Sequence, residues 1–241
     1  MFISLFENLS EEDKSNAVER LISTSTPSSD FFLMIVLSVL MATFGLLLGS
    51  GAVIIGSMLV APILSPILSL ALGITMSDAK LISRSTSTIL KSIIISIGAA
   101  ILPALFFVVN HKIVLNPEII ARTEPSLAYA VIAIIAGFAA SFALVKPRLN
   151  ETLPGIAISV ALIPPLAVTG IGIAMLDWGI VSNAFLLFVV NAIGIIFIGT
   201  INFSLMNFYV KRKVAEKTIK KEEQEQKKLL EESKKNKTID T

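Results

Sequence analysis

Long apolar runs separated by short polar segments dominate the pattern of this chain. A membrane-crossing helix needs about 20 apolar residues, and six runs reach roughly that length: 31–49, 52–74, 92–110, 127–145, 154–176 and 180–209. None has an acidic or basic residue in its middle, and none carries the charged stripe typical of helices in a large soluble protein. The pattern therefore predicts an all-α, polytopic membrane protein with six transmembrane helices.

The charges beside the runs predict the orientation. Ten basic residues lie near the ends of the runs on one side, and only Lys112 and Arg122 lie on the other. Because the side richer in lysine and arginine faces the cytoplasm, both termini are predicted to be cytoplasmic in the cell (inner) membrane. The sequence then divides into a cytoplasmic amphipathic arm and linker at 1–29, the six-helix domain at 30–210 and a charged cytoplasmic tail at 211–241.

The two flanking segments have patterns of their own. In the arm, Ser10 with Asp13 resembles a capping box, and the apolar residues that follow share one helix face: Ala17, Val18, Leu21 and Ile22. The tail holds eleven Lys/Arg and seven Asp/Glu residues without a sustained heptad. It is predicted to be a solvated helix with favourable pairs four residues apart, namely Glu216–Lys220, Glu223–Lys227 and Glu231–Lys235.

Prolines interrupt the second and fifth runs. Pro62 and Pro66 stand one turn apart in the second run, and Pro164 and Pro165 are adjacent in the fifth. Proline inside a helix costs about 3 kcal/mol because it removes a hydrogen bond and clashes with the preceding turn. At 1.5 Å per residue, Pro62 and Pro165 each lie roughly 15 Å into their helices, near the middle of a bilayer. The predicted topology makes these two helices run in opposite directions.

The two halves of the domain repeat one layout. Aligning Pro62 with Pro165 gives a helix, a proline-broken helix and a third helix in each half, as repeat one over 30–110 and repeat two over 126–210. Three crossings per half invert the second half relative to the first, and inverted repeats with interrupted helices at the midplane are typical of transporters. The predicted fold is thus two inverted three-helix repeats with proline-broken second helices.

A break at the midplane exposes backbone groups that lipid cannot hydrogen-bond, so they line a wet cavity or are buried in protein. We predict a substrate pathway lined by the prolines and the polar residues of these helices: Ser57, Pro62, Ser65, Pro66, Ser159, Pro164, Pro165, Thr169 and Asn191. The alternative is that the prolines are packing kinks whose freed carbonyls bond serine hydroxyls, and that Asn191 bonds a neighbouring helix. In the outer loop "NPEIIARTEP", Glu118, Arg122 and Glu124 predict a charged vestibule or, alternatively, an ion pair on a surface helix.

Several classes of function find no support in the sequence. The chain has no cysteine, one histidine and a formal net charge of +2, so disulfides and thiolate metal sites are excluded. It has no P-loop, GxGxxG or HExxH motif, and no candidate base lies near the serines. We therefore expect no enzyme activity, no cofactor, no metal site and no nucleic-acid partner.

Several segments, in order, resemble one known family. They are "GAVIIGSMLVAPILSPILSLALGI", "PEIIARTEP", "LPGIAISVALIPPLAVTGIGIAMLDWG" and the asparagine of the last run. Together they cover roughly residues 30–205 and are similar to the prokaryotic "uncharacterised hydrophobic domain" family, domain of unknown function 389. The resemblance implies a six-helix membrane domain of unestablished activity.

From the residues we predict a transporter or channel for a small solute or ion, with a midplane site between broken helices 2 and 5. The alternative is a non-enzymatic membrane scaffold or assembly subunit that binds partners through its charged tail. The predicted partners are the lipid bilayer, a small solute or ion, and a second copy of the chain. The patterns Gly45-xxx-Gly49 and Gly137-xxx-Ser141 are compatible with such a homo-oligomer because small residues let helices approach closely.

Overall fold

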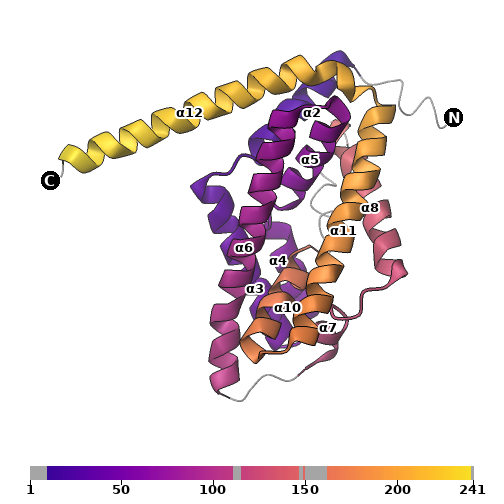
Figure 1. Ribbon diagram of the computed structural model, residues 1–241, viewed down its shortest axis with the longest axis vertical. Helices are drawn as coiled ribbons and strands as arrows, with labels where there is room; N and C mark the ends of the chain where they lie inside the picture. The colour runs from indigo at the N-terminus through magenta and orange to yellow at the C-terminus, as the bar shows by residue number, and fades with distance from the viewer. Residues whose placement is uncertain (1–9, 111–114, 147–148, 150–161, 240–241) are drawn as a thin grey trace.

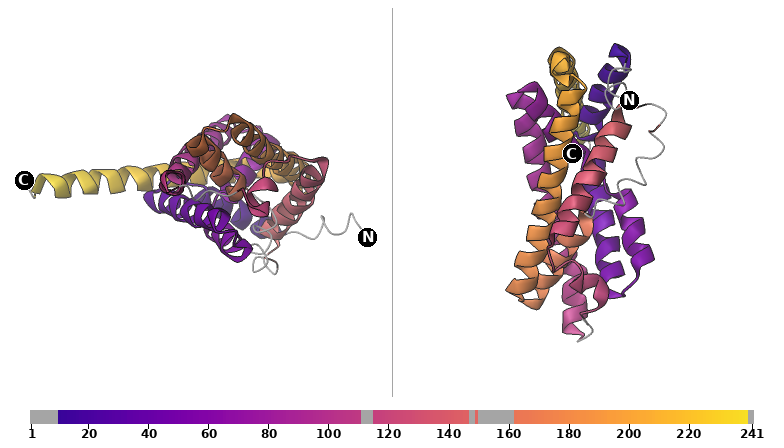
Figure 2. Two further views of the ribbon diagram at one scale, coloured as in Figure 1. Left: turned by 90° about the horizontal axis from the view of Figure 1, so that it is seen from below. Right: turned by 90° about the vertical axis from the view of Figure 1, so that its right-hand side faces the viewer.

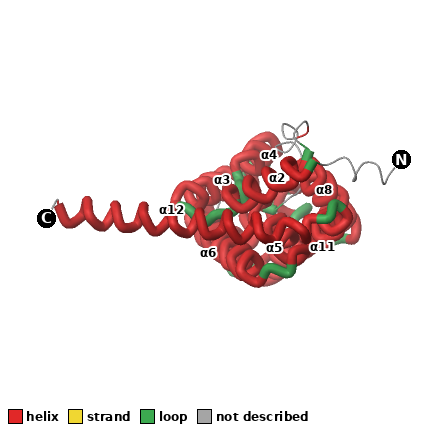
Figure 3. The backbone as a smooth tube through the Cα atoms, turned by 90° about the horizontal axis from the view of Figure 1, so that it is seen from above, coloured by secondary structure: helices red, strands yellow, loops and turns green. Residues whose placement is uncertain are grey.

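A computed structural model describes residues 10–110, 115–146, 149 and 162–239. In these ranges the helices form an elongated bundle from which one long helix projects (Figure 1, Figure 2). All regular elements of the described residues are helices and none is a strand, so the predicted all-α class is confirmed there (Figure 3).

Four described helices are long and apolar enough to cross a membrane: α3 (Ser29–Leu47), α6 (Ala79–Val109), α8 (Leu127–Val145) and α11 (Trp178–Leu205). The helices α4 (Gly51–Val60) and α5 (Leu64–Met76) meet at 50° and add a fifth span if the bent pair is one. The apolar helix α10 (Ile163–Met175) has 13 residues, too few to cross about 30 Å. A short helix, α7 (Pro117–Ile120), lies between α6 and α8. The chain is therefore a helical membrane protein, and residues 154–161 of the fifth predicted run lie outside the described residues.

The described helices overlap the predicted runs, but some helix ends differ. The bounds of α8 are those predicted, whereas α6 begins at Ala79 instead of residue 92. The cause is Asp78, whose carboxylate caps α6 by accepting 3.0 Å hydrogen bonds from the N–H groups of Lys80 and Leu81. With 31 residues, α6 is about 46 Å long and extends beyond the apolar run by its polar first turns.

Both flanking segments meet at one end of the bundle. The hydroxyl of Ser10 caps α2 (Glu11–Thr24) by accepting from the N–H of Asp13, and α2 buries the predicted apolar face. Beyond α11, η2 (Phe208–Lys211) leads into α12 (Arg212–Ile239), which packs on α2 and then projects across the long axis of the bundle (Figure 1). The segments before and after the spans thus lie on the same side. That this side is the cytoplasmic one stays a prediction.

The turns before α6 and α11 have the same construction. Helices α5 and α10 have 13 residues each, and each is followed by a left-handed residue, Ser77 with φ of 50° and Leu176 with φ of 58°. The next residue is an aspartate in both turns, and Asp78 and Asp177 each accept two backbone N–H bonds at the start of the following helix. The two helix pairs point in opposite directions, because the α5–α6 turn lies at the α2 end and the α10–α11 turn at the other end (Figure 1).

The two helix pairs also pack on each other reciprocally. Aligning the two capping aspartates pairs Ala71 with Gly170. The same alignment pairs Ala100 with Gly199. A Cβ atom built on Gly170 would lie 2.5 Å from the Cβ of Ala100, so the backbones are in close contact there. A Cβ atom built on Gly199 would lie 3.2 Å from the Cβ of Ala71. The close contact between α10 and α6 thus has a counterpart between α5 and α11, at the aligned positions of the two helix pairs.

The small residues of α3 and α8 pack inside the chain. A Cβ atom built on Gly45 would lie 2.9 Å from a side-chain atom of α4, and one built on Gly137 would lie 2.7 Å from a side-chain atom of α11. The hydroxyl of Ser141 accepts a 2.8 Å bond from the side-chain amide of Asn202 on α11. Gly49 lies in the turn after α3, with φ of 67°. Gly45, Gly137 and Ser141 therefore make contacts within one chain, and the second copy stays a prediction.

Candidate functional site

The second run contains one break, at the first of its two prolines. Helix α4 ends at Val60 and α5 begins at Leu64, with Pro62 between them. Pro66 lies in the first turn of α5, where a helix has no intrahelical N–H bond to lose. Pro62 therefore ends one helix, as predicted, whereas Pro66 helps to begin the next one.

The prolines of the fifth run resemble Pro66 in their position. Pro164 and Pro165 are buried in the first turn of α10, which begins at Ile163. The alignment of the capping aspartates pairs Pro165 with Pro66, one turn away from the predicted alignment of Pro165 with Pro62. The two alignments differ because a proline that begins a helix and one that ends a helix look alike within an apolar run.

One carbonyl freed at the break is bonded by a neighbouring helix. The hydroxyl of Ser38 on α3 donates a 2.7 Å bond to the carbonyl of Ser57, one of the last four carbonyls of α4, which have no partner within that helix. The hydroxyl of Ser57 donates to the carbonyl of Ile54 at 2.6 Å. Both serines are fully buried. Here the structure agrees with the alternative in which the prolines are packing kinks and serine hydroxyls bond the freed carbonyls. The serine that bonds this carbonyl belongs to the neighbouring helix α3.

A pocket of about 300 Å³ reaches the break from the α2 side. Its lining residues come from the end of α2, the α2–α3 connection, the start of α3 and the break: Ser23, Thr24, Thr26, Ser28, Asp30, Phe31, Met34 and Pro62. Hydroxyl groups and one carboxylate are combined here with apolar side chains. The pocket therefore joins the polar connection between α2 and α3 to the point where the α4–α5 span is interrupted.

The other predicted pathway residues have different environments. Thr169 is buried in α10, and its hydroxyl donates to the carbonyl of Pro165 at 2.8 Å. Ser65 is half-buried at the start of α5, and Asn191 is buried in α11. Ser159 lies outside the described residues. Thr169 and Asn191 thus lie inside the bundle as a pathway would require, and the hydroxyl of Thr169 also bonds its own helix.

A buried line of hydroxyls on α6 was not among the predicted site residues. Ser85, Thr88, Ser92 and Ser96 are three or four residues apart, so they share one helix face, and all are buried. The hydroxyls of Thr88 and Ser92 donate to carbonyls one turn earlier. The hydroxyl of Ser96, like that of Ser69 on α5, is buried without a hydrogen-bond partner in the described part of the chain. The spacing is visible in the sequence, but half of the line precedes the apolar run that begins at residue 92.

The buried polar side chains of the described spans are uncharged. They are Ser38, Thr43, Ser57, Ser69, Ser85, Thr88, Ser92, Ser96, Ser141, Thr169, Asn191 and Asn202. Within the described ranges, no group of three or more His, Cys, Asp or Glu side chains is placed to hold a metal ion. A solute in this interior would therefore meet neutral hydrogen-bond donors and acceptors.

The loop at the end opposite α2 forms the predicted ion pair and packs on the α3–α4 turn. Nη1 of Arg122 lies 2.7 Å from Oε2 of Glu118. The side-chain amide of Asn116 donates a 2.6 Å bond to a carbonyl in the last turn of α3, and a Cβ atom built on Gly51 would lie 3.4 Å from Oε1 of Glu118. The carboxylate is thus close to the N-terminus of α4, where a negative charge is favourable. Glu124 is exposed.

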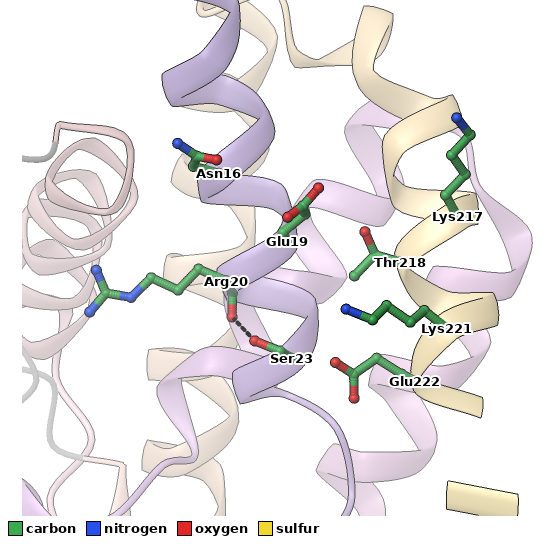
Figure 4. A pocket seen from close by; sticks show the side chains of 8 residues that line it. All are labelled: Asn16, Glu19, Arg20, Ser23, Lys217, Thr218, Lys221 and Glu222. Carbon is green, nitrogen blue, oxygen red and sulfur yellow. Dashed lines mark hydrogen bonds between the residues drawn. The ribbon is translucent and has the colours of Figure 1, made fainter. Parts of the chain in front are cut away.

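A second pocket, of about 450 Å³, lies between α2 and α12. Polar and charged side chains line it: Asn16, Glu19, Arg20, Ser23, Lys217, Thr218, Lys221 and Glu222. Lys221 and Glu222 extend from α12 toward α2, whereas the guanidinium of Arg20 points away from α12 (Figure 4). Because acidic and basic groups are mixed along this groove, it favours neither anions nor cations.

Ion pairs attach α12 and the residue before it to the rest of the α2 end. Nζ of Lys211 lies 2.9 Å from Oε2 of Glu11 on α2, and Nζ of Lys80 on α6 lies 2.8 Å from Oε2 of Glu223 on α12. The hydrogen bonds from these lysines lower the pKa of both carboxyl groups. Glu223, which the sequence predicts to pair with Lys227, thus pairs with a residue of another helix.

Comparison with known proteins supports the resemblance seen in the sequence. The family described as Domain of unknown function (DUF389) matches residues 58–197, a range that contains both capped turns. Uncharacterized protein MJ0678 of Methanocaldococcus jannaschii is 31% identical over 199 residues, which are 78% of this chain and 60% of that protein. No solved structure matches the chain. Because the family match covers more than half of its length, the chain belongs to the DUF389 family, whose function is unknown.

Proposed function

We propose that this protein is a transporter or channel for a small solute or ion, with a pathway beside the inner ends of α5 and α10. The observation that carries the proposal is a pair of half-length apolar helices that point in opposite directions and begin at prolines inside the bundle. Helix ends at membrane depth are tolerated only where protein or water satisfies their backbone groups. In transporters built in this way, such ends form the substrate site.

The same arrangement supports two inverted halves. The capped turns and the reciprocal Ala–Gly contacts relate α5–α6 to α10–α11. Each pair is preceded by an apolar helix of 19 residues, α3 in one half and α8 in the other. On this proposal the run 154–176 supplies the sixth span, as α4 with α5 supplies the second. An even number of spans leaves both termini on one side, which we propose is the cytoplasmic side of the cell membrane.

The chemistry of the interior favours a neutral hydrogen-bonding solute or a cation. The last carbonyls of α4 are freed at the break, and the buried polar side chains of the described spans are hydroxyls and amides. The N-termini of α5 and α10 favour an anion, but no lysine or arginine belongs to that buried set. We therefore expect the carbonyl, hydroxyl and amide oxygens to contribute more to recognition of the solute than the positive N-termini of α5 and α10.

The two ends of the bundle offer different approaches to this pathway. On the α2 side, the pocket that includes Pro62 connects the break to the polar α2–α3 connection. On the opposite side, the ion-paired Glu118 and Arg122, with the exposed Glu124, form the proposed vestibule. Both approaches therefore place charged side chains at the ends of the proposed pathway, whereas the buried polar side chains between them are uncharged.

Flux through reconstituted protein tests the proposal. Because the chain has no cysteine, a single Ser65→Cys variant can be modified by a water-borne thiol reagent. We expect liposomes containing the protein to pass small hydroxylated solutes or monovalent ions faster than empty liposomes, and modification to block this flux. The matched control is Ile94→Cys, at a position 71% exposed on the outside of α6. Flux equal to that of empty liposomes, or equal block at both positions, contradicts the proposal.

A second function is favoured by the hydrogen bonds of three buried hydroxyls. Ser38, Ser57 and Thr169 direct their hydroxyls to backbone carbonyls, as expected of a dry, packed core. Together with the projecting α12, this favours a non-enzymatic membrane scaffold that binds partners through its tail. The flux assay separates the two functions, since a scaffold passes no solute.

A further inference from the structure

We propose that the projecting half of α12, residues 227–239, is a membrane-surface helix that binds anionic lipid headgroups. This segment lies apart from the proposed pathway, and its binding to lipid does not depend on transport. Three properties of α12 favour such binding: the level at which it leaves the bundle, the face that its leucines share and its charge.

Helix α12 leaves the bundle at the level where α3 enters the apolar region. The side-chain amide of Gln226 donates a 3.0 Å bond to the carbonyl of Pro27, and α3 begins shortly after it, at Ser29. The first large apolar side chain exposed on α3 is Leu33, which is 55% exposed. Four helical steps from Ser29 to Leu33 add about 6 Å, and the two non-helical steps from Pro27 to Ser29 add at most about 7 Å, so Leu33 is at most about 13 Å from Pro27 along the helix axis. The headgroup layer is about 5–8 Å thick on each side of the hydrocarbon, so Gln226 lies close to that layer.

The face by which α12 docks on the protein continues into the projecting half. Ala215 and Ile219 on this face are fully buried, and Gln226 is half-buried. Leu229 and Leu230 follow Gln226 by three and four residues, so they share its face, and they are 65% and 61% exposed. Because this face is turned toward the α2–α3 connection at Gln226, it is turned toward the bilayer once α12 has passed the edge of the bundle.

The charge of this segment fits an anionic surface. Residues 227–239 contain five lysines and two glutamates. Lysines beside leucines are typical of helices that lie in the interface, with the leucines inserted and the lysines among the headgroups. Figure 1 shows α12 running across the bundle axis, with its far end closer to the level of the spans than its start. A second copy of this segment is a poorer partner, because two net-positive segments repel each other.

Spin labels on the full-length protein test the proposal. Leu229→Cys carries a nitroxide on the proposed inserted face, and Gln224→Cys carries one on the opposite, exposed face as the matched control. Each variant is placed as a single copy in nanodiscs of phosphatidylcholine, with or without one third phosphatidylglycerol. With the anionic lipid, we expect the label at 229 to collide with a water-soluble nickel chelate at least about threefold less often than the label at 224.

The outcomes distinguish membrane binding from the alternatives. Protection at 229 that needs phosphatidylglycerol supports the proposal. Equal collision rates at 229 and 224 in both nanodiscs would overturn it in favour of a solvated arm. Equal protection at 229 in both nanodiscs would overturn the role of anionic headgroups. Because each nanodisc holds one copy, contact with a second copy cannot produce the protection.

Discussion

The hydroxyl of Ser38 donates a 2.7 Å hydrogen bond to the backbone carbonyl of Ser57. The bond joins an uninterrupted span, α3, to the half-span α4 just before α4 ends at Val60. It satisfies a carbonyl that α4 cannot bond itself. The broken span is therefore supported from outside by a side chain of its neighbour.

Replacing Ser38 by alanine should destabilise the protein, because the carbonyl of Ser57 is then buried without a partner. A lost partner of this kind costs about 1–3 kcal/mol. The measurement is the free energy of unfolding in detergent, followed by circular dichroism. The matched control is Ser69→Ala, which removes a buried hydroxyl that has no hydrogen-bond partner in the described chain. Equal losses for the two variants would contradict the role of the Ser38 bond.

Gly170→Ala should be destabilising by about 1–3 kcal/mol through overpacking, because its new Cβ atom would lie 2.5 Å from the Cβ of Ala100. Adding Ala100→Gly should restore part of the loss, as the two residues share one contact. Gly98→Ala on α6 is the control, since a Cβ atom there meets nothing within 4 Å. It should be neutral or stabilising by up to about 1 kcal/mol. Thermal unfolding of these three variants and of the unmodified protein measures the effects, and an absence of rescue would count against the close contact.

Leu176→Gly should stabilise the protein. Leu176 is 77% exposed and has φ of 58°, a conformation that costs a residue with a Cβ atom roughly 1 kcal/mol. Glycine removes that cost and loses little buried surface. Leu176→Ala keeps the Cβ atom and serves as the control. If the alanine variant is as stable as the glycine variant, strain in the α10–α11 turn is not the cause.

Acid should release α12 from the bundle. The lysine partners of Glu11 and Glu223 lower the pKa of both carboxyl groups, so the docked state binds fewer protons than the released state. Docking is therefore favoured above the ordinary glutamate pKa of about 4.3 and is lost as the pH falls through the lowered values. Both groups are near the surface, so screening keeps the effect modest.

The distance between labels at Gln224→Cys on α12 and Ser83→Cys on α6 reports this release. It should lengthen below about pH 4. In Glu223→Gln the change should shrink, because that position no longer titrates. A distance that is constant through this range, or that shortens on acidification, would contradict the role of the ion pairs.

Local chemistry explains which parts of the fold were predictable from the sequence. The bounds of α8, the break at Pro62 and the cap at Ser10 each depend on a short stretch of sequence: an apolar run, a proline or a capping side chain. The predicted start of this helix, residue 92, was wrong because hydropathy alone does not detect the cap at Asp78, after which α6 begins at Ala79. The pairing of Pro165 with Pro66 required the capped turns, whose left-handed residues, serine and leucine, share no sequence pattern.

The candidate site was less predictable because it depends on contacts between helices. Ser38 is distant in sequence from the break at Pro62, so only the packing of α3 on α4 identifies it as the partner of Ser57. The regular spacing of the hydroxyl residues on α6 is visible in the sequence. A polar stripe on a surface helix would have the same spacing, and only the burial of these residues in the assembled bundle distinguishes the two. The ion pair of Glu118 with Arg122 was predictable because both residues belong to one short segment.

A pathway at the inner ends of the half-length helices requires that water reaches them, and labelling of single cysteines tests this most directly. The positions are Ser65→Cys at the start of α5, Ser96→Cys on the hydroxyl line and Thr169→Cys in α10, in a chain that has no cysteine of its own. Ile94→Cys and Leu102→Cys, at positions 71% and 69% exposed on the outside of α6, are the lipid-facing controls. In folded protein in a bilayer, a membrane-impermeant thiol reagent should label the three interior positions and leave both controls unlabelled. Protection of all three interior positions would contradict a wet pathway and leave a dry, packed core.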